Sequence, residues 1–373
     1  MRLMIVAGEA SGDLLGGDLL AGLKEHFPQI QVCGVGGPRL AEQGLLGPFG
    51  INDLSVIGIV EVVHRLPRLR RVFRYLTHLL TAERPDLLIT IDLPDFNFML
   101  AKRAKALHIP VIHYVCPQVW AWRRGRVQRI ASLVDHLLVL FPFEPIYFQP
   151  TGLPVTFVGH PLVEKTRSKL AKRLDFRKQL ELSNQDKLVV LLPGSRSGEL
   201  QRHLEVMVST CHQLAQRLSK VQFILALAEN LSLEEVENFP WPIRQGMTQE
   251  LLAASDAALV ASGTATLEAA LLDAPMVVIY RVNFFTYEIG RRVIQVPFIS
   301  LANLVVQREL VKERIQKMAN PDLLADDLFT LLTDSEQIAR IRSGYQEIRT
   351  LLSSQERGAV EIVSQFLQGT HNI

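Results

Sequence analysis

The sequence predicts an α/β protein in which two Rossmann-like domains face each other across a cleft. Short apolar runs alternate with longer stretches of helical character, and the runs fall into two series, as expected of two parallel sheets with helical crossovers. The expected strands are residues 2–7, 31–35, 86–91, 110–115 and 135–141 in the first series and 187–192, 221–227, 256–261 and 275–281 in the second. Functional residues are expected at the carboxyl ends of these strands, where ligands of open α/β sheets gather.

The length and composition of the chain fit two domains, because it has 373 residues of which 48% are hydrophobic. Gly159-His160-Pro161 ends the first series, and a charged stretch follows before the second series begins. We therefore expect an N-terminal domain over residues 1–168 and a C-terminal domain over residues 169–340. Residues 341–373 are expected to form terminal helices that pack back across the domains, since apolar residues recur at helical spacing behind Asp334, a suitable N-cap.

Charge and cysteine usage argue against several classes of protein. Forty basic residues balance 38 acidic ones, and the net charge of +2 disfavours a general nucleic-acid binder. The three cysteines, Cys33, Cys116 and Cys211, match neither a disulfide framework nor a paired zinc-ligand spacing, which favours a reducing compartment. Residues 1–7 lack the regions of a signal peptide, and no later run reaches about 18 apolar residues. We expect a cytoplasmic protein, with attachment to a membrane surface as an option.

A glycine turn after the first strand of the second series predicts a nucleotide-diphosphate site. In LLPGSRSGE, residues 191–199, Gly194 frees the backbone to turn its amides toward an anion. Ser195 is a candidate cap for the helix that follows, and Arg196 adds a forked positive charge. The alternative is an ordinary capped turn that carries a surface arginine.

A second glycine turn, ASGTATLEA at residues 261–269, strengthens the diphosphate interpretation. Ser262, Gly263 and Thr264 form a small, hydroxyl-rich turn, and Glu268 lies in the first turns of the expected helix, where its carboxylate could accept both ribose hydroxyls. The alternative for Glu268 is an acidic residue that simply favours the positive end of a helix.

Two turns of the first series carry carboxylates. GEASGD, residues 8–13, contains Glu9 and Ser11 but matches neither standard phosphate loop, which argues against ATP hydrolysis and nicotinamide binding. TIDLPDFNF, residues 90–98, places Asp92, Asp95 and Asn97 at the end of a strand. Burial beside phenylalanines would raise the pKa of one of these carboxylates, so that it could take a proton from a sugar hydroxyl. The alternative is turn chemistry.

Two further segments suggest contact with an amphiphilic ligand or a membrane. In HYVCPQVWAWRRGRVQRI, residues 113–130, tryptophans and arginines suit a phosphorylated amphiphile, and the alternative is a packed strand end above a solvated basic helix. Residues 54–80 combine an apolar run with an amphipathic, arginine-rich helix that fits a bilayer surface, or equally a helix packed on the core. The expected membrane contacts are Val56, Ile57, Arg68, Leu69, Val72 and Phe73.

The motifs GEASGD, IDLPDFN, PQVWAWR, FPFE, GHP, LLPGSRSGE, SGTATLE and RELVKE occur in this order along nearly the whole chain. Together they closely resemble the lipid A disaccharide synthases, a bacterial family of glycosyltransferases with the GT-B type of fold. The resemblance implies an inverting transfer of 2,3-diacylglucosamine from its UDP-activated form to the 6-hydroxyl of 2,3-diacylglucosamine 1-phosphate (lipid X), a step of lipid A and lipopolysaccharide biosynthesis. It also implies that the C-terminal domain holds UDP and that the N-terminal domain faces the acceptor and the membrane.

The resemblance assigns roles to individual residues. The family's required aspartate falls on Asp92, the first choice for the base, and its essential arginine falls on Arg196. Asn303, in SLANLV, is implied to contact the donor, although Ala302 stands where the family usually has proline. The full donor set is Gly194, Ser195, Arg196, Met247, Ser262, Gly263, Thr264, Glu268 and Asn303. The acceptor or interdomain set is Glu9, Ser11, Asp95, Asn97, Trp120, Arg123 and His160.

The expected partners are the UDP-sugar donor, lipid X, the cytoplasmic face of the bacterial inner membrane and, as a candidate, a second copy of the chain. Neither a cofactor, a metal nor a nucleic acid is expected. Two alternatives stay open: another UDP-sugar enzyme, such as a peptidoglycan-precursor transferase or a UDP-sugar 2-epimerase, and a nonenzymatic, nucleotide-regulated membrane adaptor. Another carboxylate than Asp92 also stays open as the base.

Overall fold

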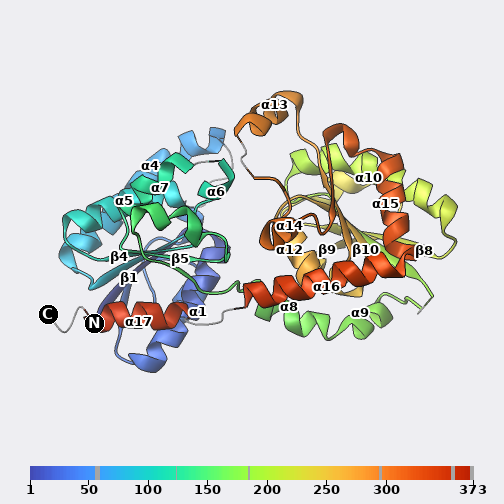
Figure 1. Cartoon of the computed structure of the whole chain (residues 1–373). Helices are drawn as coiled ribbons and strands as arrows, with labels where there is room; N and C mark the ends of the chain where they lie inside the picture. Colours follow the sequence, from blue (N-terminus) through green and yellow to red (C-terminus); the bar gives the residue numbers. More distant parts are fainter. Residues whose placement is uncertain (55–58, 123, 184, 294–295, 354–357, 370–373) are drawn as a thin grey trace. The chain divides into compact units, whose positions relative to one another are not determined.

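The computed structural model describes residues 1–54, 59–122, 124–183, 185–293, 296–353 and 358–369. The chain forms two compact units (Figure 1). The first unit comprises Met1–His160 and Ser354–Ile373, and the second comprises Pro161–Ser353. Each unit is an α/β layer structure around one parallel sheet, as the sequence predicts.

The first unit contains a six-stranded parallel sheet in the order β2-β1-β3-β4-β5-β6. Its strands are β1 (Arg2–Ala7), β2 (Gln31–Val35), β3 (Leu87–Ile91), β4 (Val111–Tyr114), β5 (His136–Val139) and β6 (Val155–Phe157). Successive side chains of a strand enter opposite cores: Met4 and Val6 pack on one face, and Leu3 and Ile5 on the other. In the register of the sheet, Ile91 lies opposite both Ala7 and Tyr114, so the carboxyl ends of three strands meet at one edge.

Helices cover both faces of this sheet. Figure 1 shows α1 and α17 on one face and α4, α5 and α7 on the other. The helices are α1 (Ala10–His26), α2 (Pro38–Glu42), α3 (Ile51–Leu54), α4 (Ile59–Ala82), α5 (Pro94–Ala106), α6 (Val119–Trp122), α7 (Val127–Ala131) and α17 (Ala359–Gly369), with short 3-10 turns η1 (Arg124–Arg126), η2 (Pro145–Tyr147) and η3 (Gln149–Thr151). Helix α17 approaches α1 so closely that a side chain at Gly22 would collide with Val360.

The second unit repeats this architecture with the strand order β12-β11-β10-β7-β8-β9. Its strands are β7 (Lys187–Leu192), β8 (Val221–Leu227), β9 (Ile243–Gln245), β10 (Ala257–Ala261), β11 (Met276–Tyr280) and β12 (Lys312–Ile315). Its helices are α8 (Leu162–Leu170), α9 (Arg173–Gln179), α10 (Ser197–Arg217), α11 (Thr248–Ala254), α12 (Thr264–Leu271), α13 (Phe284–Val293), α14 (Leu301–Val306), α15 (Pro321–Thr333) and α16 (Ser335–Leu352), with η4 (Leu233–Val236) and η5 (Gln316–Met318). Strands β7 and β10 are neighbours, which places their two glycine turns side by side.

The unit boundaries differ from those expected. Helix α8 packs on α11 and α12, so the chain enters the second unit at Pro161 rather than after residue 168. The tail is divided between the units, because α16 packs on α12 and α14 of the second unit whereas α17 packs on α1 of the first. The edge strands β6, β9 and β12 lie outside the expected ranges, since three or four partly exposed residues leave no continuous apolar run.

Helix α4 corrects part of the membrane-contact prediction. Val72 is fully buried, and Leu69 and Phe73 pack against the same core, where the ring of Phe73 meets Phe96 edge to face at 5.8 Å. Core packing therefore accounts for the apolar stripe of this helix. Arg68 forms an ion pair with Asp53. Val56 and Ile57 lie outside the described residues.

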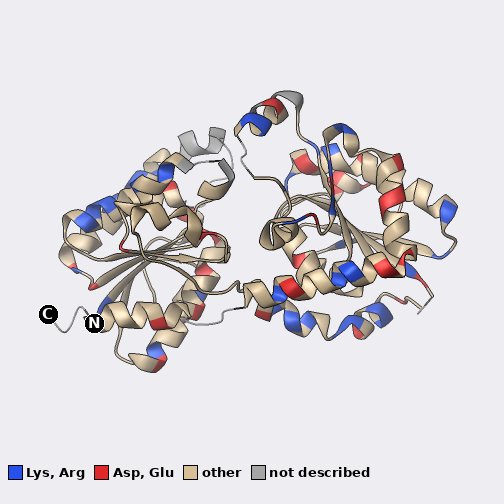
Figure 2. Ribbon diagram, in the orientation of Figure 1, with Lys and Arg blue, Asp and Glu red and all other residues tan. Residues whose placement is uncertain are grey.

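The outer face of α4 is basic. Arg70, Arg71 and Arg74 are exposed, and Figure 2 colours lysines and arginines blue along this helix. Among the residues the structure describes, no helix is both long enough and apolar enough to cross a bilayer.

Candidate active site

Asp92 lies directly after β3 in a strained backbone conformation. Asp92 and Leu93 both have positive φ angles, +52° and +44°, which non-glycine residues rarely adopt and which cluster at functional sites. The bend is held on both sides: the Asp92 amide donates to the carbonyl of Tyr114 at 3.1 Å, and Asn97 Nδ2 donates to the carbonyl of Asp92 at 2.7 Å. These two hydrogen bonds fix the backbone from which the Asp92 carboxylate extends at the end of β3.

The N-terminal end of α1 crowds the Asp92 carboxylate. Ser11 Oγ donates to Asp92 Oδ2 at 3.4 Å, and a side chain on Gly12 would stand 3.4 Å from the same oxygen. Gly8 lies close to Leu93, because a Cβ at this position would stand 2.6 Å from Leu93 Cδ2 and would force that side chain to shift. Burial, together with the nearby negative charge of Glu9, raises the pKa of Asp92 to about 6, against a smaller lowering by the Ser11 hydrogen bond. This carboxyl is poised for proton transfer near neutral pH.

The other polar residues of this turn have structural partners. Asn97 is fully buried and also donates to the carbonyl of Ile91 at 3.1 Å, so it positions the turn. Asp95 is 77% exposed and pairs with Arg126 at 2.9 Å. Asp13, the last residue of GEASGD, is buried and accepts hydrogen bonds from the amides of Gly37, Arg39 and Leu40. It therefore ties α1 to the start of α2.

A second cluster of the first unit joins the motifs PQVW, FPFE and GHP. Trp120 is only 5% exposed, and its Nε1 donates to Glu144 Oε1 at 3.1 Å. The other oxygen of Glu144 accepts the amides of Leu140 and Phe141 at 3.2 and 3.0 Å. Burial raises the pKa of Glu144 to about 8. Trp120 is thus a clamped core residue and not the open ligand platform that the sequence suggested.

His160 lies at the edge of this cluster, with its ring 5.3 Å from that of Phe141. Arg123 lies outside the described residues. Glu144 was missed as a site residue, although a carboxylate inside the apolar FPFE segment was the available signal.

The turn after β7 in the second unit is open. Gly194 adopts φ +115°, and a Cβ there would collide with Glu199 at 2.4 Å, so glycine is required. The Ser195 amide donates to Glu199 Oε2 at 3.1 Å, and Arg196 itself is the N-cap residue of α10, which corrects the capping role expected for Ser195. The Arg196 side chain is 78% exposed, with Glu199 at 3.5 Å as its ion-pair partner. An exposed cation beside the positive end of a long helix suits an anionic ligand.

The turn after β10 lies next to it. Gly263 and Thr264 are exposed at the start of α12, whereas Ser262 Oγ donates to the carbonyl of Ile299 at 2.8 Å. Glu268 accepts a hydrogen bond from Gln249 Nε2 at 3.0 Å, which joins α12 to α11. Met247 directly precedes α11. The hydroxyl of Ser262 is therefore committed to the fold, while Thr264 and Glu268 remain at the surface of the site.

Asn303 has a different role from the donor contact expected of it. Its side chain is fully buried: Nδ2 donates to the carbonyl of Val311 and to Glu313, and Oδ1 accepts the amides of Leu310 and Val311, all within 2.9 Å. Both donors and both acceptors of the amide are thus used. Asn303 positions the loop before β12, and Glu313 of RELVKE completes this network.

In the described part of the chain, no group of three or more His, Cys, Asp or Glu side chains is placed to bind a metal ion.

Solved structures with the same architecture define the class. The chain is similar to UDP-GlcNAc 2-epimerase from Neisseria meningitidis bound to UDP-GlcNAc, with a TM-score of 0.62, 13% identity and all of both chains covered. It is also similar to the glycotransferase of kitacinnamycin, with a TM-score of 0.61, 15% identity and coverage of 99% of this chain and 98% of the other. At such identities the likeness shows the fold alone, which is the two-domain Rossmann-like GT-B fold.

The particular family follows from closer relatives. The model of the lipid-A-disaccharide synthetase family matches residues 3–367, and the chain belongs to this family. It is 42% identical to the lipid-A-disaccharide synthase of Pseudomonas paraeruginosa over 376 residues, covering 99% of this chain and 98% of the relative. It is 40% identical to that of Myxococcus xanthus, covering 96% and 94%. The chain is therefore a glycosyltransferase, as the motifs predict.

Proposed function

We propose that this chain forms the lipid A disaccharide. It transfers 2,3-diacylglucosamine from UDP-2,3-diacylglucosamine to the 6-hydroxyl of lipid X and releases UDP, giving the beta-1,6-linked disaccharide 1-phosphate. Family membership supports the reaction. The observation that carries the mechanism is Asp92, a half-buried carboxylate on a strained turn with a pKa raised to about 6.

Asp92 is assigned the role of general base. Its carboxylate takes the proton of the acceptor 6-hydroxyl while that oxygen attacks the anomeric carbon of the donor. The bond between the anomeric carbon and the UDP oxygen breaks as the new glycosidic bond forms, so a single displacement inverts the configuration. Ser11 keeps the carboxylate oriented through its hydrogen bond to Oδ2.

The second unit is assigned the UDP donor. Arg196 and the amides at the start of α10 stabilise the negative charge that develops on the departing diphosphate. Thr264 and the Gly263 turn complete the phosphate contacts, and Glu268 binds the ribose hydroxyls, oriented by Gln249 at 3.0 Å. The proposal calls for no cofactor, because these groups supply the positive field.

The protein is proposed to work on the cytoplasmic face of the bacterial inner membrane, where both acylated substrates reside. The exposed Arg70, Arg71 and Arg74 of α4 supply a basic surface for anionic headgroups. Changing Arg70 and Arg74 to Gln should weaken binding to anionic vesicles by about 1 kcal/mol for each charge removed. Arg103→Gln on α5 is the matched control. If this variant lost as much vesicle affinity per charge as the α4 variants, α4 would not be the membrane-binding surface.

A second copy of the chain is a candidate partner.

The function is tested with radiolabelled UDP-2,3-diacylglucosamine and lipid X in detergent micelles. The expected products are the disaccharide 1-phosphate and UDP, with no turnover of unacylated UDP-N-acetylglucosamine. Epimerisation or transfer of the unacylated sugar would favour another UDP-sugar enzyme. Binding of UDP and vesicles without any disaccharide would favour an adaptor.

A further inference from the structure

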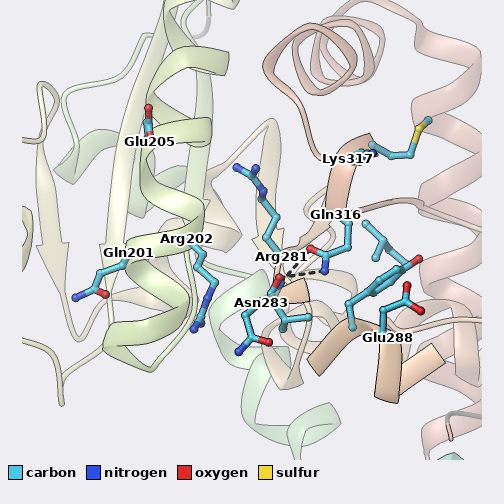
Figure 3. A pocket seen from close by; sticks show the side chains of 12 residues that line it. Gln201, Arg202, Glu205, Arg281, Asn283, Glu288, Gln316 and Lys317 are labelled. Carbon is cyan, nitrogen blue, oxygen red and sulfur yellow. Dashed lines mark hydrogen bonds between the residues drawn. The ribbon is translucent and has the colours of Figure 1, made fainter. Parts of the chain in front are cut away.

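The second unit contains a cavity of about 750 Å³ at the carboxyl ends of β11 and β12 (Figure 3). One wall is the start of α10, and the facing walls are the segment from β11 into α13 and the segment from β12 into η5. None of the residues assigned to UDP lines this cavity. It is therefore a separate feature of the unit that the proposed reaction leaves unexplained.

The charges that line the cavity are predominantly positive. Arg202, Arg281 and Lys317 contribute cations, and Glu205 and Glu288 contribute carboxylates. Glu288 is already paired with Arg291 at 3.0 Å and with Arg292 at 3.7 Å. Arg202 donates to the neutral carbonyl of Gly198, and no carboxylate among the described residues pairs with it. Glu205 alone opposes three cations, so the cavity attracts anions.

The backbone of Arg281 is held from beneath by a buried histidine. The Arg281 amide donates to His203 Nε2 at 3.0 Å, and His203 Nδ1 donates to the carbonyl of Pro193 at 2.7 Å. These two bonds fix the tautomer of His203, which is fully buried and whose pKa is lowered mainly by that burial. Pro193 directly precedes the Gly194 turn. His203 thus holds the exit of β11 at a set position relative to the turn that carries Arg196.

The next residue is held as well. Val282 donates its amide to Gln316 Oε1 at 3.2 Å and accepts from Gln316 Nε2 at 3.0 Å, the pair of dashed contacts in Figure 3. In contrast to this fixed backbone, the half-buried Arg281 side chain makes neither a hydrogen bond nor an ion pair with any residue that the structure describes. The side chains of His203 and Gln316 therefore fix the backbone from which the Arg281 guanidinium extends, and this guanidinium has no partner among the described residues.

We propose that this cavity is a binding site for the phosphomonoester group of an amphiphilic ligand, with Arg281 as its principal contact. The planar fork of a guanidinium matches the oxygens of a phosphate. Arg202 stands on the opposite wall, on α10, and Lys317 stands on η5, so both add positive charge to the lining of the cavity. Val282, Ile315 and Met318 give the site an apolar side that would hold the ligand's hydrocarbon. This inference rests on the lining of the cavity and not on the proposed transferase reaction.

Equilibrium binding to the full-length protein tests the site. The probes are short-chain dihexanoyl phosphatidic acid, dihexanoyl phosphatidylcholine and inorganic phosphate, measured by calorimetry. Arg281→Gln should weaken binding of the phosphatidic acid about 10-fold, as expected for loss of one charged hydrogen-bonding partner. Arg244→Gln, which changes an exposed arginine on β9, is the matched control and should bind like the wild type. Arg196→Gln should also retain binding, which separates this cavity from the diphosphate turn.

The probes distinguish the sources of the phosphate. Tighter binding of phosphatidic acid than of inorganic phosphate supports an amphiphilic ligand, whereas equal binding of the two overturns that part of the proposal. Binding of phosphatidic acid should strengthen from about pH 5 to about pH 7.5 as the phosphate takes its second charge. Equal affinity of wild type and Arg281→Gln, or a loss confined to Arg196→Gln, overturns the site. Thermal melting of Arg281→Gln, expected to match the wild type, excludes misfolding as the cause of a loss.

Discussion

Asp92 in the first unit and Arg196 in the second stand on similar strand-to-helix turns, but the two side chains differ in burial and in how firmly they are held. Asp92 is a non-glycine residue in a left-handed conformation, half buried, with both sides of its backbone hydrogen-bonded. Arg196 follows a glycine, is 78% exposed and has a loose contact with Glu199 at 3.5 Å. A proton acceptor must be desolvated and oriented before substrate arrives. A cation that binds a diphosphate can stay exposed until the ligand arrives, because contact with the ligand then orders its side chain.

The comparison predicts its largest effect for Asp92→Asn. The amide has the same shape but cannot accept a proton, so transfer should fall by roughly 10²- to 10⁴-fold while UDP affinity stays largely unchanged. Steady-state kinetics and UDP calorimetry on the same preparation measure both quantities. Near-normal turnover would eliminate the role of Asp92 as the base.

Arg196→Ala should weaken both UDP binding and transfer by roughly 10- to 100-fold, since it removes a charged hydrogen-bonding partner of the diphosphate. Arg244→Ala, at another exposed arginine of the same unit, is the control and should leave both unchanged. If Arg196→Ala lost turnover but bound UDP normally, Arg196 would not be a residue that binds the diphosphate.

Asp92→Asn should also stabilise the fold at neutral pH. The pKa of Asp92 is raised in the folded state from 3.8 to about 6, so its contribution to stability is lost as pH rises between these values. Removing the charge should therefore raise the free energy of unfolding by at most roughly 3 kcal/mol above about pH 7, and by nothing below about pH 4. Urea unfolding at both pH values measures this difference. Arg196→Ala should change stability by less than about 0.5 kcal/mol at either pH.

The smallest expected effects are opposite shifts of one pH profile. Since Glu9 raises the pKa of Asp92 and Ser11 lowers it, Glu9→Gln should move the rise of kcat/KM toward lower pH and Ser11→Ala toward higher pH. The wild-type profile should rise through about pH 6. Shifts of the same sign in both variants would show that another group controls the profile.

The two turns also show what the sequence could predict. The central strands carry continuous apolar runs, so their ends, and with them Asp92 and Gly194, could be placed in advance. Amphipathic periodicity cannot tell a core from a bilayer, which is why Val72 was expected at the membrane and is found fully buried.

The hydrogen-bond partners of the buried polar side chains could not be predicted from the sequence. Nothing near Asn303 in the sequence indicates that Glu313 and the backbone of Val311 would use its whole amide. Likewise, His203 gives no sign in the sequence that it bridges Pro193 and Arg281, because that contact spans 78 residues. The contact between His203 and Arg281 arises from the order of strands in the sheet, whereas those of Asn303 arise from the path of the loop between α14 and β12.

The most direct test of the account is to titrate the Asp92 side chain itself. Carbon-13 NMR of aspartate-labelled protein, with Asp92→Asn to assign the signal, should give a carboxyl midpoint of about 6 that coincides with the rise of kcat/KM. A midpoint near the ordinary 3.8, with the rate profile rising elsewhere, would contradict the assignment of Asp92 as the base.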